Sequence, residues 1–168
     1  KLVTSNYCSH TCTVEVAQAI FQTGKLMSAV KVFGKSGAEI VTDSRNAASD
    51  PADYFDYIMF GWSNTSSGYR LAMERLLGRA PSEEELQGKF IPGVSFHFLY
   101  EELIQAPGYM FDGYHVAKVR DSLDLDTFLH LCVIPSKDRS CFEGLIPCQL
   151  QDRVIYLDYE GEGLQAWN

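Results

Sequence analysis

The chain has 168 residues, a formal net charge of −8 and an apolar content of 46%. This length and apolar content are enough to bury one hydrophobic core, which excludes an intrinsically disordered chain and favours a single domain over residues 1–168. The negative charge argues against a broad phosphate-binding surface, and the chain has no run of about 18 apolar residues that would cross a membrane.

The first third of the chain predicts a strand, a helix and a polar connection. Residues 1–9 form the expected first strand. Apolar side chains then recur at helical spacing between an N-cap at Thr13 and a helix stop at Gly24. A short strand over residues 27–33 and a polar, turn-rich loop over residues 34–53 follow.

The next segment is apolar at first and then helical. Residues 54–62 are aromatic and apolar, which fits either a strand or a buried helical turn. Residues 66–79 carry apolar side chains at helical spacing and predict a helix. Ser82 and Glu85 have the spacing of a capping box, which begins a further short helix.

From residue 90 onward the pattern changes to the alternation of strands. Residues 90–100 place phenylalanines on one face and Ser95 and His97 on the other. Residues 109–120 and 127–135 predict further strands.

The chain ends with an expected hairpin between strands at residues 143–147 and 153–159. One strand, then helical material, then several strands predict an α+β fold with largely antiparallel sheets and helices on the flanks. Neither common glycine-rich phosphate loop is present in the sequence.

Five scattered cysteines do not suggest a disulfide framework, so a reducing compartment is the default. Cys8, His10 and Cys12 alternate and would share one face of a strand, an arrangement that allows a metal triad. Structural zinc sites need a fourth ligand and usually a tighter cysteine knuckle, so we favour packed thiols and expect no metal. Because the chain begins at Lys1 rather than Met, we expect a processed or excised part of a longer protein.

Three motifs occur in a fixed order along the chain. His10 ends the expected first strand and precedes a helix and the turn "GKL" at residues 24–26. The motif "GVSF" opens a middle strand at residues 93–96, and "EGLIP" opens a late strand at residues 143–147. In this order and spacing the sequence resembles the ADP-ribosyltransferase family. The late motif is similar to that of bacterial toxins in this family that modify nucleic acid.

The resemblance implies an ADP-ribosyltransferase-like fold in which two packed, mainly antiparallel sheets form a cleft. It implies an enzyme that uses NAD as co-substrate and transfers ADP-ribose to an acceptor, with Glu143 as the catalytic carboxylate. The residues implied to hold NAD are His10, Thr11, Ser95, Phe96 and Tyr69. A carboxylate suits this chemistry because cleavage of the nicotinamide–ribose bond develops positive charge on the ribose. His10, Ser95 and Glu143 are then required to converge on one cleft.

Two departures from the family pattern leave the subclass open. Ser95 stands where members with a first-strand His usually carry Tyr, and a Ser there is more typical of members with an Arg. Those members use a Glu-x-Glu pair, and Glu160 and Glu162 come too late for a hairpin to follow. We therefore favour Glu143.

Several alternatives for function remain open. A relative in the same fold could hydrolyse NAD or remove a 2′-phosphate from RNA. A non-enzymatic α+β binding module is the alternative from a different class. For the acceptor, the net charge favours a protein or small molecule over nucleic acid. A toxin or effector that acts in a cytoplasm, or a cytoplasmic enzyme, is the expected setting, with no membrane association.

Overall fold

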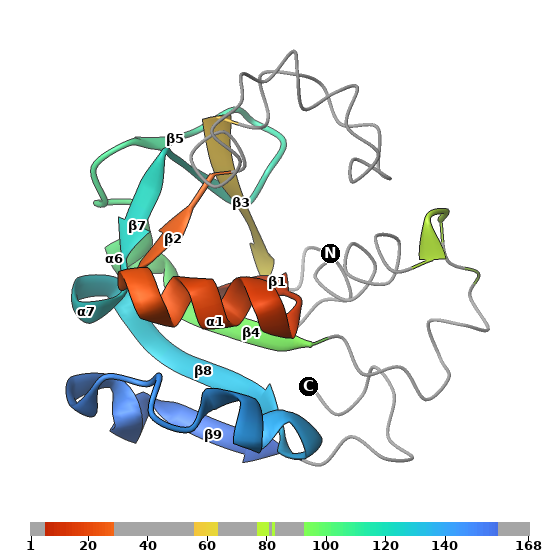
Figure 1. Ribbon diagram of the computed structural model, residues 1–168. Coiled ribbons are helices and arrows are strands. Elements are labelled where there is room, and N and C mark those ends of the chain that lie inside the picture. The colour runs from red at the N-terminus through yellow and green to blue at the C-terminus, as the bar shows by residue number, and fades with distance from the viewer. Residues whose placement is uncertain (1–5, 29–55, 64–76, 81, 83–92, 158–168) are drawn as a thin grey trace.

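The computed structural model describes residues 6–28, 56–63, 77–80, 82 and 93–157 (Figure 1). The expected loop at 34–53, Glu85 of the capping box, most of the expected strand at 27–33 and most of the expected helix at 66–79 lie outside these residues. Among the described residues, a search for helices with the length and hydropathy of a membrane span finds none.

Helix α1 (Val14–Thr23) has the bounds that the sequence predicts. The Thr13 hydroxyl accepts a hydrogen bond from the Val16 amide at 3.4 Å, which caps the first turn. Gly24 adopts φ 74° and donates its amide to the Ile20 carbonyl at 2.8 Å, which ends the helix. The buried face of the helix consists of Ala17, Ile20 and Phe21.

A mainly antiparallel seven-stranded sheet forms the centre of the fold, in the order β5-β6-β3-β1-β4-β8-β9. Among the strand pairs that the structure describes, only β8–β9 is parallel. The strands are β1 (Tyr7–Cys12), β3 (Tyr57–Trp62), β4 (Val94–Leu99), β5 (Tyr109–Met110), β6 (Ala117–Arg120), β8 (Leu129–Pro135) and β9 (Val154–Leu157). A second sheet pairs β2 (Lys25–Met27) with β7 (Ser122–Asp124). The expected mixture of helices and mainly antiparallel strands is therefore confirmed.

Short helical segments complete the described fold. They are α6 (Tyr100–Leu103), α7 (Leu125–Phe128) and the 3₁₀ helices η2 (Ser136–Phe142) and η3 (Cys148–Arg153). Figure 1 shows α1 lying over β1 and β4, with η2 and η3 beside β8 and β9 at the blue, C-terminal end of the described chain. The core lies between α1 and the sheet, where Phe21 packs on Phe96 with ring centroids 5.5 Å apart.

Three expected strands differ from the structure in their bounds or type. The first strand runs over Tyr7–Cys12 and so continues beyond its expected end at residue 9; residues 1–5 of the expected strand lie outside the described residues. Residues 54–62, for which a strand and a helical turn were both open, contain strand β3. The single strand expected at 109–120 is divided into β5 and β6, because the chain turns at Gly113 with φ 76°.

The expected C-terminal hairpin is wrong. Residues 143–147 form no strand: the chain leaves η2, turns at Gly144 with φ 75° and enters η3. Strand β9 then pairs with β8 in the parallel sense. Parallel neighbours need a crossover connection rather than a tight turn, and residues 136–153 supply that connection. The short apolar run before Pro147 is explained by partial burial instead of a strand, since Ile146 packs against the core from the turn between the two 3₁₀ helices.

Candidate functional site

Strands β1 and β4 carry four of the residues predicted to hold NAD. In their antiparallel register His10 lies opposite Phe96, and Thr11 lies opposite Ser95. Directly opposed residues project to the same face of a sheet, whereas successive residues alternate. His10 and Phe96 therefore project toward α1, and Thr11 and Ser95 project to the opposite face. The fifth residue, Tyr69, lies outside the described residues.

His10 is half-buried on the α1 side of the sheet. Its Nδ1 lies 3.1 Å from the Met59 carbonyl oxygen. A carbonyl oxygen only accepts, so Nδ1 carries the proton in this contact and, in the neutral ring, Nε2 carries the lone pair. The imidazole also meets the Phe60 ring edge-on, at 6.1 Å between centroids. These contacts hold the orientation of the His10 ring.

Glu143 follows η2 and is exposed. Helix η2 is attached to α1, because the Gln18 side chain donates to the Cys141 carbonyl at 2.9 Å. Phe142, the neighbour of Glu143, is buried and meets Phe21 edge-on at 5.9 Å. Glu143 therefore belongs to the side of the sheet that α1 covers, which is also the side of His10.

The three residues expected to converge on one cleft do not all lie on one side of the sheet. His10 and the segment with Glu143 lie on the same side of the sheet. Buried rings connect the two: Phe96, opposite His10, contacts Phe21 of α1, and Phe21 contacts Phe142, the residue before Glu143. Ser95 is fully buried and projects to the other side. The structure thus does not bring Ser95 together with the other two.

A buried polar network that the sequence did not predict occupies this other face. Both ring nitrogens of His97 are 2.8 Å from a serine hydroxyl: Nδ1 from Ser63 and Nε2 from Ser95. Burial, with a smaller contribution from His130, lowers the pKa of His97 to about 4. Alternation along β4 indicates that Ser95 and His97 share a face. No sequence signal pairs Ser63 with them, since it lies 34 residues before His97.

The cysteines of β1 are packed in the core. Cys8 and Cys12 are buried, and burial raises the pKa of Cys8 to about 12. Cys132 on β8 is also buried, and its pKa is raised for the same reason. Across the part of the chain that the structure describes, no group of three or more His, Cys, Asp or Glu side chains has a geometry that could hold a metal ion.

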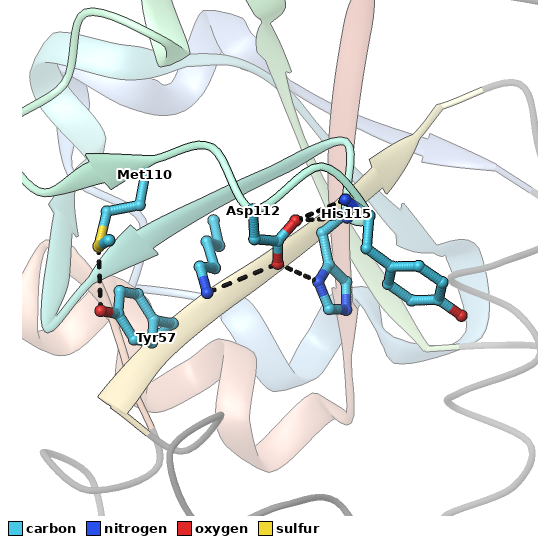
Figure 2. A network of polar contacts seen from close by, with 6 residues as sticks. Tyr57, Met110, Asp112 and His115 are labelled. Carbon is cyan, nitrogen blue, oxygen red and sulfur yellow. Dashed lines mark hydrogen bonds and ion pairs between the residues drawn. The ribbon is translucent and has the colours of Figure 1, made fainter.

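Asp112 organises the loop between β5 and β6 (Figure 2). Its Oδ1 accepts the backbone amides of Tyr114 and His115, each at 2.8 Å. Its Oδ2 accepts from His115 Nδ1 at 2.7 Å and lies 3.5 Å from Lys118 Nζ. The hydrogen bond from His115 is the largest cause that holds the pKa of Asp112 well below its ordinary value. The loop is thus fixed by one ionised carboxylate.

The same loop is joined to β3 and carries exposed aromatic side chains. The Tyr57 hydroxyl donates to Met110 Sδ at 3.0 Å, and Lys118 Nζ lies 4.4 Å from the centre of the Tyr57 ring. Phe111 and Tyr114 are 76% and 85% exposed. The network in Figure 2 is therefore a surface feature at the β5–β6 end of the sheet. Strand β3 lies between β6 and the strands β1 and β4 that carry His10 and Phe96.

No protein-family model, curated protein or solved structure matches this chain. Its function is therefore inferred from its own residues and from the resemblance described above.

Proposed function

We propose that this chain is an NAD-dependent ADP-ribosyltransferase with an ADP-ribosyltransferase-like fold, acting as a toxin or effector on a protein or small-molecule acceptor. The observation that supports this most is the register of β1 and β4. The strand with His10 lies directly beside the strand that begins "GVSF", and His10 lies opposite Phe96. The resemblance implies that both His10 and Phe96 hold NAD, and this register puts them side by side on one face of the sheet.

The glycine of the "GVSF" motif has a physical role that fits this reading. Gly93 adopts φ +99°, and a Cβ at this position would lie 2.4 Å from the Cys12 carbonyl oxygen. Only glycine allows the start of β4 to approach the end of β1 so closely. The motif glycine therefore positions the two strands whose side chains are proposed to bind NAD.

In this proposal NAD binds on the α1 side of the sheet. His10 is oriented through Nδ1 by the Met59 carbonyl and presents the rest of its ring to the nicotinamide half of NAD. Phe96 and Phe21 form the apolar base beneath it. Glu143 is the carboxylate that stabilises the positive ribose in the transition state and accepts a proton from the acceptor.

Thr11 and Ser95 take a different role from the one that the resemblance implies. Both project to the face opposite His10, and Ser95 hydrogen-bonds His97. We assign them to the support of β1 and β4 rather than to contact with nicotinamide. Tyr69 remains a proposed NAD contact that lies outside the described residues.

The first test is incubation of the protein with NAD, with released nicotinamide measured by mass spectrometry and the melting temperature measured against NAD concentration. We expect nicotinamide release and a rise in melting temperature, because a ligand that binds only the folded state stabilises it. If NAD causes neither nicotinamide release nor a rise in melting temperature, both the transferase and the NAD-hydrolysing alternative are excluded.

The same assay separates the remaining alternatives. If ADP-ribose is released into solution as fast without an acceptor as with one, the protein is an NAD glycohydrolase. Removal of phosphate from a 2′-phosphorylated RNA indicates the phosphotransferase. A melting shift without turnover indicates a binding module. Incubation of labelled NAD with a protein extract and, separately, with single- and double-stranded DNA identifies the class of acceptor.

A further inference from the structure

We propose that Ser63 is a nucleophilic serine, with His97 as its general base and Ser95 as the residue that orients that base, and that it reacts with carboxylic or phosphoric esters. This centre lies on the face of the sheet opposite His10. It is therefore separate from the proposed NAD site and does not depend on it.

The geometry is that of a nucleophile, a base and an orienting group. Ser63 Oγ lies 2.8 Å from His97 Nδ1, and Ser95 Oγ lies 2.8 Å from His97 Nε2. Both distances are within the range expected between an activated hydroxyl, its base and the group that holds the base. Ser95 and His97 come from β4, and Ser63 is the residue that follows β3.

His97 is neutral near neutral pH, so one of its ring nitrogens can accept a proton. Burial keeps the imidazole in this form, in which one ring nitrogen donates and the other accepts. In the reactive tautomer, Nε2–H donates to Ser95 and Nδ1 accepts the hydroxyl proton of Ser63. Among the described residues, His130 of β8 contributes to the lowered pKa of His97, and the Tyr7 ring of β1 lies against His130 with ring centroids 4.9 Å apart.

Exposure decides which serine is the nucleophile. Ser95 is fully buried, whereas Ser63 is partly exposed and His97 is 8% exposed. A reagent from solvent can therefore reach Ser63 but not Ser95. Ser63 itself is held in place because its backbone amide donates to the Tyr7 carbonyl at 3.0 Å.

The proposed step balances without a further reagent. Ser63 Oγ attacks the ester carbonyl carbon, and its proton moves to His97 Nδ1. The carbon–oxygen bond to the leaving alcohol then breaks, and the alcohol departs with that proton. Water attacks the acyl-serine by the same route and regenerates the hydroxyl.

The test uses diisopropyl fluorophosphate on the whole protein, with the labelled peptide located by mass spectrometry. Ser63 Oγ bonds to phosphorus, fluoride leaves and the proton goes to His97. Because a positioned base contributes about 10²- to 10⁴-fold, we expect Ser63 to be labelled at least about 10²-fold faster than Ser140, an exposed serine of η2. Equal rates at the two serines would overturn the proposal.

Two variants make the result independent of the probe and of folding. Ser63→Ala, at a partly exposed position, should abolish fast labelling and leave NAD turnover unchanged. Ser63→Cys should be alkylated by iodoacetamide faster than Ser140→Cys, because the neutral His97 ring beside it accepts the thiol proton as the sulfur attacks. Alkylation of Ser63→Cys no faster than of Ser140→Cys would also contradict the role of His97 as a base, whatever the NAD assay gives.

Discussion

His10 and Ser95 lie on neighbouring paired strands, yet their side chains leave the sheet on opposite faces. The register sets His10 against Phe96 and Ser95 against Thr11, so the faces follow from the alternation of strand side chains. One ligand bound on one face cannot contact both residues. This relationship separates two residues that the sequence motifs alone place at a single NAD site.

The first prediction compares His10→Ala with Ser95→Ala. His10→Ala should remove the NAD-dependent rise in melting temperature while leaving the fold intact. Ser95→Ala should leave that rise unchanged but lower the free energy of unfolding by about 1–3 kcal/mol, because a buried nitrogen of His97 loses its partner. Calorimetry with and without NAD measures both. The opposite pattern would place NAD on the Ser95 face.

The second prediction concerns the carboxylate. Glu143→Gln should reduce nicotinamide release by about 10²- to 10³-fold, since it removes charge that stabilises the transition state, and should leave NAD binding nearly unchanged. Glu102→Gln is the matched control, because Glu102 is an exposed glutamate on α6. Equal turnover in the two variants would remove Glu143 from the mechanism.

The third prediction tests the contact between β1 and β4. Gly93→Ala should lower the free energy of unfolding by about 3 kcal/mol or more, because the new Cβ meets the Cys12 carbonyl at a strained φ. Gly144→Ala also has positive φ, but its Cβ would meet nothing within 4 Å, so about 1–2 kcal/mol is expected. Urea unfolding of the two variants measures this difference. Similar losses of unfolding free energy would mean that the close approach of β4 to the Cys12 carbonyl does not require a glycine at position 93.

The fourth prediction concerns acid stability. The pKa of His97 is about 4 in the folded protein and about 6.5 when unfolded, so the unfolded chain binds the proton first. The free energy of unfolding should therefore fall by about 3 kcal/mol as the pH drops from 6.5 to 4 and stay level above that range. Asp112 loses its stabilising effect only below its ordinary pKa of 3.8.

The control for this prediction is His97→Gln, which removes the titrating ring. Its stability at neutral pH will be lower, but its unfolding free energy should depend less on pH between 4 and 6.5. An unchanged slope in this variant would assign the acid sensitivity to other groups.

The fifth prediction concerns the loop in Figure 2. Asp112→Asn keeps an oxygen acceptor for the amides of Tyr114 and His115, whereas Asp112→Ala removes every contact. Hydrogen exchange of these amides should accelerate strongly in the Ala variant and only slightly in the Asn variant. Global stability should change by less than about 1 kcal/mol in the Asn variant, because a surface ion pair contributes little. Equal exchange in both variants would mean that charge, not the amide acceptor, holds the loop.

Local patterns were enough to predict several elements from the sequence. The helix from Val14 to Thr23 begins and ends where Thr13 and Gly24 indicate, because capping depends on hydrogen bonds within a few residues. The alternation along β4 likewise predicts which of its side chains share a face. The mainly antiparallel character of the fold follows from the order of these local elements.

The tertiary structure alone decided what depends on residues far apart in the chain. Residues 143–147 look like a strand, but the chain uses them within a crossover between the parallel strands β8 and β9. Ser63 meets His97 only because β3 and β4 both pair with β1. Alternation and capping act over a few residues, whereas strand partners and faces are set by the packing of the whole sheet. The sequence by itself thus determined the helix, the strand alternation and the residues worth testing, and the sheet decided which of those residues meet.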